Sequence, residues 1–207
     1  MLRDEVVDLI RSRAGGLRNK DALIMQEMGF VQRTQLEGNS WIPWFLESEL
    51  SQAATTAGER RLPFPVDFLG EIEEQELMLV LPDGTELPFR EKGNYDVLAR
   101  KYPGSGMPVA YATVGEYFAF FPLPDQAYGI KTRYYARDVS MIAENVETKW
   151  LKYASDVVVA AAGAAIAGKV LQNAALEASF KSDLAAAWDR LYKRHVAMEE
   201  VNQTRTM

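Results

Sequence analysis

The sequence contains no cysteine and only one histidine, His195. Without cysteine, disulfide bonds, thiolate zinc sites and cysteine nucleophiles are excluded. A Ser-His-Asp triad would have to use His195, and a metal site made of several histidines cannot be built. We therefore expect no metal, no other cofactor and no catalytic residues in this chain.

Positive charge is also scarce in the sequence. Lys and Arg number 23 against 29 Asp and Glu, which gives a net charge of -6 at pH 7. Nucleic acid is held mainly by cations that neutralise its phosphates. General nucleic-acid binding is therefore disfavoured.

Long hydrophobic runs are missing as well. The longest run, residues 157–168, is about half of the ~20 residues that a membrane helix requires. The first residues also lack the basic and then apolar pattern of a secretory signal. We interpret the run as a buried helix, and we expect a chain without membrane contact that stays in the cytoplasm unless another component carries it out.

Helical spacing of apolar residues marks both ends of the chain. It covers residues 6–10 and 24–31 at the beginning, with glycine-containing breaks after each segment. It returns from about Glu144 into the long apolar run, and after a break near Ser179 it continues over residues 184–198. The pattern predicts four helices, two from each end.

The middle of the chain is typical of β structure, because proline and glycine become frequent and the apolar period falls toward two. Residues 77–81 and 85–89 flank Asp83-Gly84 and predict a hairpin. Three further strands suggest an antiparallel meander: residues 109–114, 117–121 and 128–135. The predicted fold class is α+β, a four-helix scaffold of residues 1–40 and 139–207 with an inserted antiparallel β domain of residues 41–138.

No group of residues amounts to an active site. Carboxylates at Glu71, Glu73, Glu74 and Glu76 would suit glycoside hydrolysis, but acidic runs are common on solvated surfaces. His195 lies on an apolar stripe, which favours a core-edge or interface position over a general base.

Aromatic residues gather between the expected second helix and the first strands. They are Trp41, Trp44, Phe45, Phe64 and Phe68. Stacking on a ligand is one interpretation. The favoured interpretation is a hydrophobic core that joins the second helix to the first strand, because large aromatic side chains dominate core energetics.

Small residues recur on neighbouring turns of the long apolar run. They are Ala160, Gly163, Ala164, Ala167 and Gly168. Missing side chains let a second backbone approach closely. We expect this face to pack tightly against a helix, either within the subunit or in a neighbouring subunit.

Six short motifs follow one another along nearly the whole chain: residues 43–47 (PWFLE), 55–60 (TTAGER), 62–69 (LPFPVDFL), 123–128 (LPDQAY), 145–151 (NVETKWL) and 187–192 (AWDRLY). In this order they resemble the head-to-tail adaptor proteins of tailed bacteriophages. The chain departs from the family at residues 154–158 (ASDVV), where a Pro-Asp-Leu sequence is usual.

The resemblance implies a structural virion protein and not an enzyme. Related adaptors form dodecameric rings that dock on the portal after DNA packaging, extend the DNA channel and give the next tail or nozzle protein its platform. The expected location is the neck of the virion, with the host cytoplasm as the place of assembly. DNA would pass through the channel without sequence-specific binding.

Two segments are candidate contacts with partner proteins. Residues 202–207 carry no apolar period, so we expect them to be loose in the free subunit and to become ordered on the portal. The candidate portal-binding residues are Val201, Asn202, Gln203, Thr204 and Arg205. A flexible, glycine-containing tip is the candidate contact with a tail protein: Pro103, Gly104, Ser105, Gly106 and Met107.

Two other functions stay open at the level of sequence. One is a virion-associated peptidoglycan hydrolase that uses carboxylates such as Glu73 and Glu76. The other is a scaffold or assembly protein that is not part of the virion.

Overall fold

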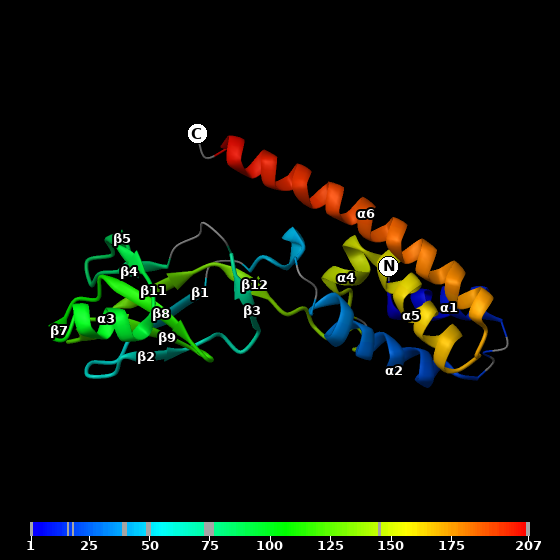
Figure 1. Cartoon of the computed structure of the whole chain (residues 1–207), viewed down its shortest axis with the longest axis horizontal. Helices are drawn as coiled ribbons and strands as arrows, with labels where there is room; N and C mark the ends of the chain where they lie inside the picture. The colour runs from blue at the N-terminus through cyan, green and yellow to red at the C-terminus, as the bar shows by residue number, and fades with distance from the viewer. Residues whose placement is uncertain are drawn as a thin grey trace. The chain divides into compact units, whose positions relative to one another are not determined.

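The computed structural model describes residues 2–15, 17, 19–38, 41–48, 51–72, 77–144 and 146–205. The chain divides into two compact units (Figure 1). We call them the helical unit, which is Met1–Leu46 with Arg137–Met207, and the β unit, which is Glu47–Ala136. Helices and strands are largely segregated in this way, so the fold belongs to the α+β class.

The helical unit is built from five α-helices and two short turns within the described residues. Its elements are α1 (Arg3–Ala14), α2 (Asp21–Val31), the π-helical turn η1 (Gln32–Leu36), the 3-10 turn η2 (Trp44–Leu46), α4 (Lys149–Tyr153), α5 (Ser155–Lys169) and α6 (Ala174–Arg205). The 3-10 turn packs against α4 and α6. For this reason residues 41–46, which the sequence assigns to the β region, belong to the helical unit.

Two helix boundaries differ from the sequence prediction. The helix expected from about Glu144 is divided at Ala154, where φ is -143° and ψ is 36°, outside the helical region. The break expected near Ser179 lies earlier, before Ala174, because Gln172 has a positive φ of 49° and Asn173 caps α6 by accepting the backbone N–H of Leu176 at 3.0 Å. The C-terminal part therefore forms three helices instead of two.

Helix α5 lies at the centre of the helical unit. All residues between Val157 and Ala167 except Ala165 are buried, as expected for a helix that is apolar around its whole circumference. Helices α1, α2 and α6 pack against it. The prediction that this run is a buried helix is confirmed. Among the helices of the described residues, none combines the length and hydrophobicity of a membrane span.

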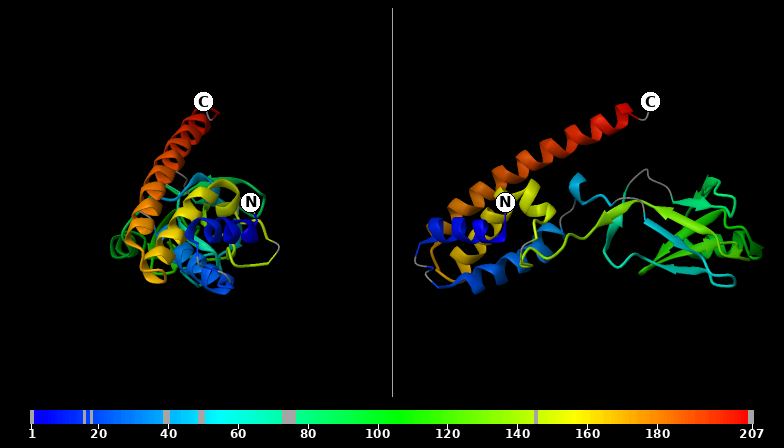
Figure 2. Two further views of the ribbon diagram at one scale, coloured as in Figure 1. Left: turned by 90° about the vertical axis from the view of Figure 1, so that its right-hand side faces the viewer. Right: turned by 180° about the vertical axis from the view of Figure 1, so that it is seen from behind.

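Helix α6 is much longer than its neighbours, with 32 residues and a length of about 48 Å. Its buried side chains include Phe180, Ala187, Leu191 and His195. Met198 is next on the same stripe, and 44% of it is exposed. Figure 2 shows α6 continuing past the ends of the other helices in this unit. The last turns of α6 thus lie beyond His195, the last of its buried side chains in the described residues.

Within its described residues, the β unit contains two four-stranded sheets. The first sheet has the order β1 (Ser51–Ala54), β11 (Gly129–Thr132), β4 (Met78–Val80), β5 (Glu86–Pro88). The second sheet has the order β2 (Arg61–Pro63), β9 (Tyr117–Phe121), β8 (Ala110–Val114), β6 (Glu91–Lys92). Two short ladders complete the unit: β12 (Tyr134–Ala136) with β3 (Phe68–Glu71), and β10 (Leu123–Pro124) with β7 (Ser105–Gly106).

The hairpin predicted around Asp83-Gly84 is confirmed as β4 and β5. Gly84 has a positive φ of 85°, and Asp83 accepts the backbone N–H of Thr85 at 2.9 Å. The predicted meander is wrong. Strands β8 and β9 form a hairpin, but β11 pairs with β1 and β4 in the other sheet. Pairing is also not wholly antiparallel, because β6 with β8 and β7 with β10 are parallel.

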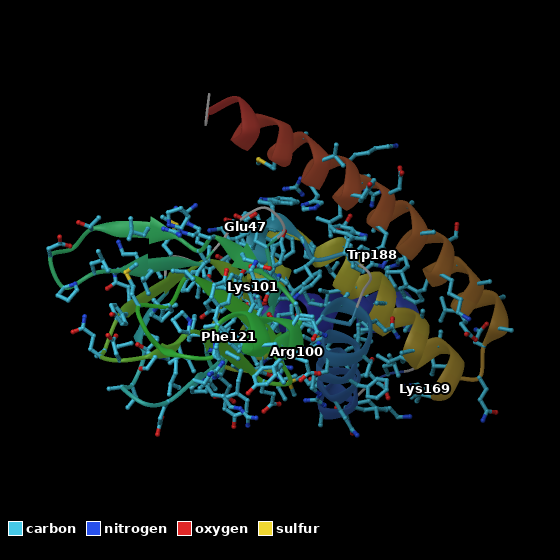
Figure 3. All side chains as sticks on the ribbon, turned by 60° about the vertical axis from the view of Figure 1, so that its left-hand side comes forward. Glu47, Arg100, Lys101, Phe121, Lys169 and Trp188 are labelled. Carbon is cyan, nitrogen blue, oxygen red and sulfur yellow. The ribbon has the colours of Figure 1, made fainter. Side chains whose placement is uncertain are left out.

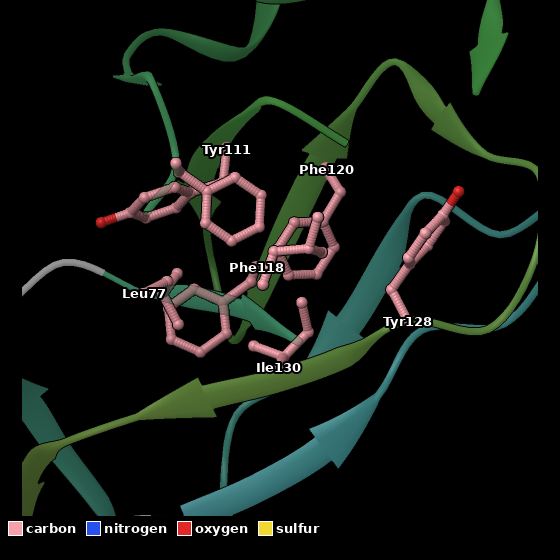
Figure 4. Packing of buried hydrophobic residues seen from close by; sticks show 8 residues of the cluster. Leu77, Tyr111, Phe118, Phe120, Tyr128 and Ile130 are labelled. Carbon is pink, nitrogen blue, oxygen red and sulfur yellow. The ribbon is translucent and has the colours of Figure 1, made fainter. Parts of the chain in front are cut away.

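The core of the β unit lies between the two sheets. Strand β9 directs Phe118 and Phe120 into this core, where they meet Ile130 of the first sheet (Figure 4). Leu79 of β4 belongs to the same cluster. The alternate residues of β9 point to the opposite face, which helix α3 (Tyr95–Lys101) covers with Leu98. The second sheet is therefore buried on both faces at residues 118–121 of β9.

The predicted single aromatic core is wrong, because the structure divides its members between the two units. Trp44 and Phe45 contact Tyr153 in the helical unit. Phe64 and Phe68 pack against Phe118 in the β unit. Adjacency in sequence did not reveal that the chain passes from one unit to the other between these two pairs.

Candidate interaction surfaces

The face of small residues on α5 is occupied within the chain. Ala160, Ala164 and Ala167 are buried. A Cβ atom added at Gly163 would lie 2.4 Å from a ring carbon of Phe180 on α6, and one added at Gly168 would lie 2.8 Å from the carboxylate of Glu177. The predicted close helix contact is therefore the one between α5 and α6, and these buried side chains are not available to a neighbouring subunit.

A groove with a volume of about 310 Å³ lies between α1, α5 and α6. Its apolar lining includes Leu9, of which 40% is exposed, and Val159. Two ion pairs flank it: Arg13 with Asp183, and Arg190 with Asp156 at 2.8 Å. Elsewhere on this unit, Lys169 lies at the end of α5, where Figure 3 labels it. It binds Glu27 of α2 at 2.9 Å. The surface of the helical unit thus carries charges that are paired with one another.

His195 is a core residue, with 7% of its surface exposed. Its ring stacks on Trp41 with 5.1 Å between centroids, and its Nδ1 accepts the backbone N–H of Trp44 at 3.2 Å. Trp188 and Tyr192 of α6 contact Trp41 edge-on. The interpretation of His195 as a core-edge residue is confirmed, since it fixes α6 to the segment that precedes the β unit.

The end of α6 contains the candidate portal-binding residues. The segment expected to be loose from residue 202 is helical through Arg205. The side chains of residues 199–205 lie outside the described part of the structure, as do residues 206 and 207. The backbone of this segment continues helix α6, which begins in the packed part of the helical unit.

The segment of residues 103–107 is anchored and does not form a flexible tip. Ser105 and Gly106 form strand β7, which pairs with β10. The N–H of Leu123 donates to the carbonyl of Gly104 at 3.0 Å, and the Ser105 hydroxyl donates to the carbonyl of Leu123 at 3.0 Å. The side chains of Pro103 and Met107 are nevertheless exposed, so the segment is an accessible surface with a fixed backbone.

The acidic run falls mostly outside the described residues, which exclude Glu73, Glu74 and Glu76. Glu71 is engaged, because it pairs with Lys92 and accepts a hydrogen bond from the hydroxyl of Thr113. Within the described ranges, no group of three or more His, Asp or Glu side chains is arranged to hold a metal ion.

A buried polar cluster that the sequence did not reveal lies in the helical unit. The side chain of Gln32, in the π-helical turn, donates to Glu37 at 2.9 Å and to the carbonyl of Val139 at 3.1 Å, and it accepts the N–H of Met141 at 2.9 Å. Asp138 accepts the N–H of Trp150 at 2.9 Å at the start of α4. The cluster ties the two chain segments that lead to and from the β unit.

Burial raises the pKa of both carboxyl groups in this cluster. For Glu37, the hydrogen bond from Gln32 and the charge of Arg137 oppose this rise, and the charge of Asp138 adds to it. For Asp138, the hydrogen bond from the N–H of Trp150 opposes the rise. The folded state therefore favours the protonated forms of these two side chains more than the unfolded chain does.

The raised pKa values predict a pH dependence of stability. A carboxyl group with a raised pKa stabilises the fold below its unfolded pKa of about 4, and this contribution is lost as the pH rises through the folded pKa. Glu37→Gln keeps the acceptor for Gln32 but cannot ionise. We expect its free energy of unfolding, relative to wild type, to increase between about pH 4 and pH 7 in urea titrations. A constant difference across this range would contradict the role of Glu37.

Charge is distributed unequally between the two units. The helical unit contains 15 Lys and Arg and 15 Asp and Glu, so it is neutral. The β unit contains 8 Lys and Arg against 14 Asp and Glu, so it carries the whole net charge of -6. Neutral surfaces with mixed charges associate without net repulsion, whereas strongly charged ones repel their own copies.

The described surfaces include anchored, exposed segments. A family model, the SU10 adaptor protein, matches residues 4–207. No curated protein matches the chain. Because the family model covers nearly the whole sequence, the chain belongs to the SU10 adaptor family, whose members are structural adaptor proteins of phages and are not a known enzyme family.

Proposed function

We propose that this chain is the subunit of a ring in the neck of a tailed-phage virion. The ring docks on the portal, extends the DNA channel and provides the attachment platform for tail proteins. The observation that carries the proposal is the family match over residues 4–207. The copy number is twelve by analogy with the adaptors that the sequence resembles.

The distribution of charge supports a ring made through the helical unit. Copies can pack side by side through a surface whose 15 positive and 15 negative groups balance. The excess of carboxylates in the β unit gives DNA phosphates few cations to bind, so DNA slides past without adhering. A channel protein needs this property, because adhesion would slow ejection.

The end of α6 is the proposed portal contact. The helix continues through Arg205, beyond His195, the last of its buried side chains in the described residues. Isolated helices shorter than about 12 residues are marginal in water, because most helical stability comes from packing. A groove on the portal would supply this packing to Val201, Asn202, Gln203, Thr204 and Arg205.

Removing the residues after Glu200 tests this contact. The truncated chain keeps all the side chains of α6 that are buried among the described residues, including His195, so its fold should be retained. We expect portal binding, measured by co-sedimentation with purified portal rings, to fall at least tenfold. Electron microscopy of the full-length chain on the portal tests the ring itself.

The truncated and full-length chains test the portal contact of α6 and the proposed ring function separately. Undiminished binding by the truncated chain would rule out the end of α6 as the portal contact while leaving the ring intact. Failure of the full-length chain to bind the portal in any form would overturn the proposed function.

The β unit is the proposed side for tail attachment. Residues 103–107 are a candidate contact, because their backbone is fixed while Pro103 and Met107 are exposed. A rigid, exposed segment loses little conformational entropy when a partner binds.

A further inference from the structure

Edge strands of the β unit differ in how well they resist a further strand. An edge strand presents unpaired N–H and C=O groups along one side, and another chain can pair with them. Natural proteins protect such edges with proline, charge or short length. The first sheet has the edges β1 and β5, and the second has β2 and β6.

Strand β5 is protected by a proline at an outward position. The N–H of Leu81 donates to the carbonyl of Thr85 at 2.9 Å, and the bonded pairs alternate from there along the ladder. The backbone groups of Leu87 therefore point toward β4, and those of Glu86 and Pro88 point outward, away from the sheet. Because proline has no N–H, an added strand would miss a hydrogen bond at Pro88.

Strand β2 is protected in the same way. The N–H of Phe64 donates to the carbonyl of Glu116 at 3.0 Å, so alternation directs the backbone groups of Leu62 toward β9 and those of Arg61 and Pro63 outward. Strand β6 is only Glu91 and Lys92, both charged and too few for a stable ladder.

Strand β1 carries none of these protections. The N–H of Thr55 donates to the carbonyl of Tyr128 at 2.9 Å, which turns the backbone groups of Ala53 toward β11 and those of Gln52 and Ala54 outward. Residues 52–54 are exposed and contain neither charge nor proline. Within the described residues of the two four-stranded sheets, β1 is the edge that offers free donors and acceptors to a further strand.

We propose that β1 is a docking site for an extended strand from a different protein, which joins the first sheet beside Gln52 and Ala54. The inference rests on the proposed function, which makes a tail component the partner. This partner contributes a segment of at least four residues in β conformation, and its docking segment carries net positive charge, because the β unit has 14 acidic against 8 basic residues.

A second copy of this chain is the less suitable occupant. The other edges of its two four-stranded sheets carry the same prolines and charges, so among these described edges β1 is the one open to pairing. Pairing of β1 with β1 is two-fold symmetric and closes on itself, which cannot continue around a ring. The like net charge of the two β units also opposes such a contact.

Ala54→Pro tests the site with little expected effect on the fold. The substitution removes an N–H that faces outward and is not used by β11, and proline is tolerated on edge strands in this position. Ala54→Val is the matched control, since it keeps the N–H and favours a strand. Both variants are loaded onto portal-bearing heads that lack this chain, and tails are then added from an extract depleted of it.

The expected result has two parts. Both variants bind the heads as the wild type does, and Ala54→Pro lowers the yield of tailed particles at least tenfold while Ala54→Val does not. Tailing by Ala54→Pro at the wild-type level would overturn the docking site. Failure of the wild type to bind heads would instead overturn the proposed function, so the two failures are distinguishable.

Amide hydrogen exchange in the wild type gives a second test that does not depend on a variant. The amides of Gln52 and Ala54 should exchange quickly in the free chain and become protected in tailed particles. Protection in particles that carry the adaptor but no tail would point to pairing between copies and would contradict the proposed partner. No protection in tailed particles would also overturn the proposal.

Discussion

Gly163→Ala should destabilise the helical unit by about 1–2 kcal/mol, although alanine is the better helix former. The added Cβ would lie 2.4 Å from a ring carbon of Phe180, whose side chain is fully buried. Overpacking of this kind costs about 1–3 kcal/mol. Alanine recovers about 1 kcal/mol of helix propensity, which offsets only part of the loss.

Gly29→Ala is the matched control for this prediction. Gly29 also lies inside a helix, but a Cβ there would meet Ile142 at 3.5 Å, an ordinary contact distance. We expect this variant to be more stable than wild type by up to about 1 kcal/mol. The same substitution thus has opposite effects at two helical glycines, and packing against α6 explains the difference.

Tryptophan fluorescence during urea unfolding measures both variants. The four tryptophans, Trp41, Trp44, Trp150 and Trp188, all belong to the helical unit, so their signal reports on this unit. Adding Phe180→Leu to Gly163→Ala should cost less than the sum of the single changes, because the two residues share one space. Stabilisation by Gly163→Ala would show that α5 and α6 are not in close contact at this point.

Local sequence signals predicted the elements that local interactions determine. The hairpin of β4 and β5 follows from Asp83 and Gly84, which set the turn through one hydrogen bond and a positive φ. The burial of α5 follows from its composition, because a helix without a polar face has no solvated side. These features need no knowledge of the rest of the chain.

Elements that depend on distant partners were not predicted correctly. The pattern of β11 indicates a half-buried strand, and its alternation is real: Tyr128 and Ile130 are buried. Periodicity does not identify the neighbour of a strand, however, and the neighbours of β11 are β1 and β4 instead of β9. The predicted meander is wrong for this reason, because sheet order is set by long-range packing.

For the candidate surfaces too, the sequence indicated local features but did not identify distant partners. The sequence indicated close packing at Gly163 and left the partner open, and the structure identifies it as Phe180 of α6. Nothing in the sequence around Gln32 indicates burial, because its partners Val139 and Met141 lie more than 100 residues away. Helix α3 was also missed, although Asn94 gave a local signal as the N-cap that accepts the N–H of Asp96.

Phe120→Ala should produce the largest loss of stability in the β unit, about 3–5 kcal/mol. Phe120 is fully buried between the two sheets and stacks on Phe89 with 5.4 Å between ring centroids. The substitution removes the ring from a core that cannot collapse easily, because both sheets are fixed by their ladders. Tyr117→Ala is the control on the same strand, and since 41% of Tyr117 is exposed, its loss should be far smaller.

Two measurements in the same samples distinguish the units in this experiment. Exchange of the β8 and β9 amides reports on the β unit, while tryptophan fluorescence reports on the helical unit, which contains all four tryptophans. If the units unfold separately, Phe120→Ala accelerates exchange in β8 and β9 and leaves the fluorescence transition almost in place. If both signals shift equally, the chain unfolds as one cooperative body, and the β insertion then stabilises the helices that are proposed to form the ring.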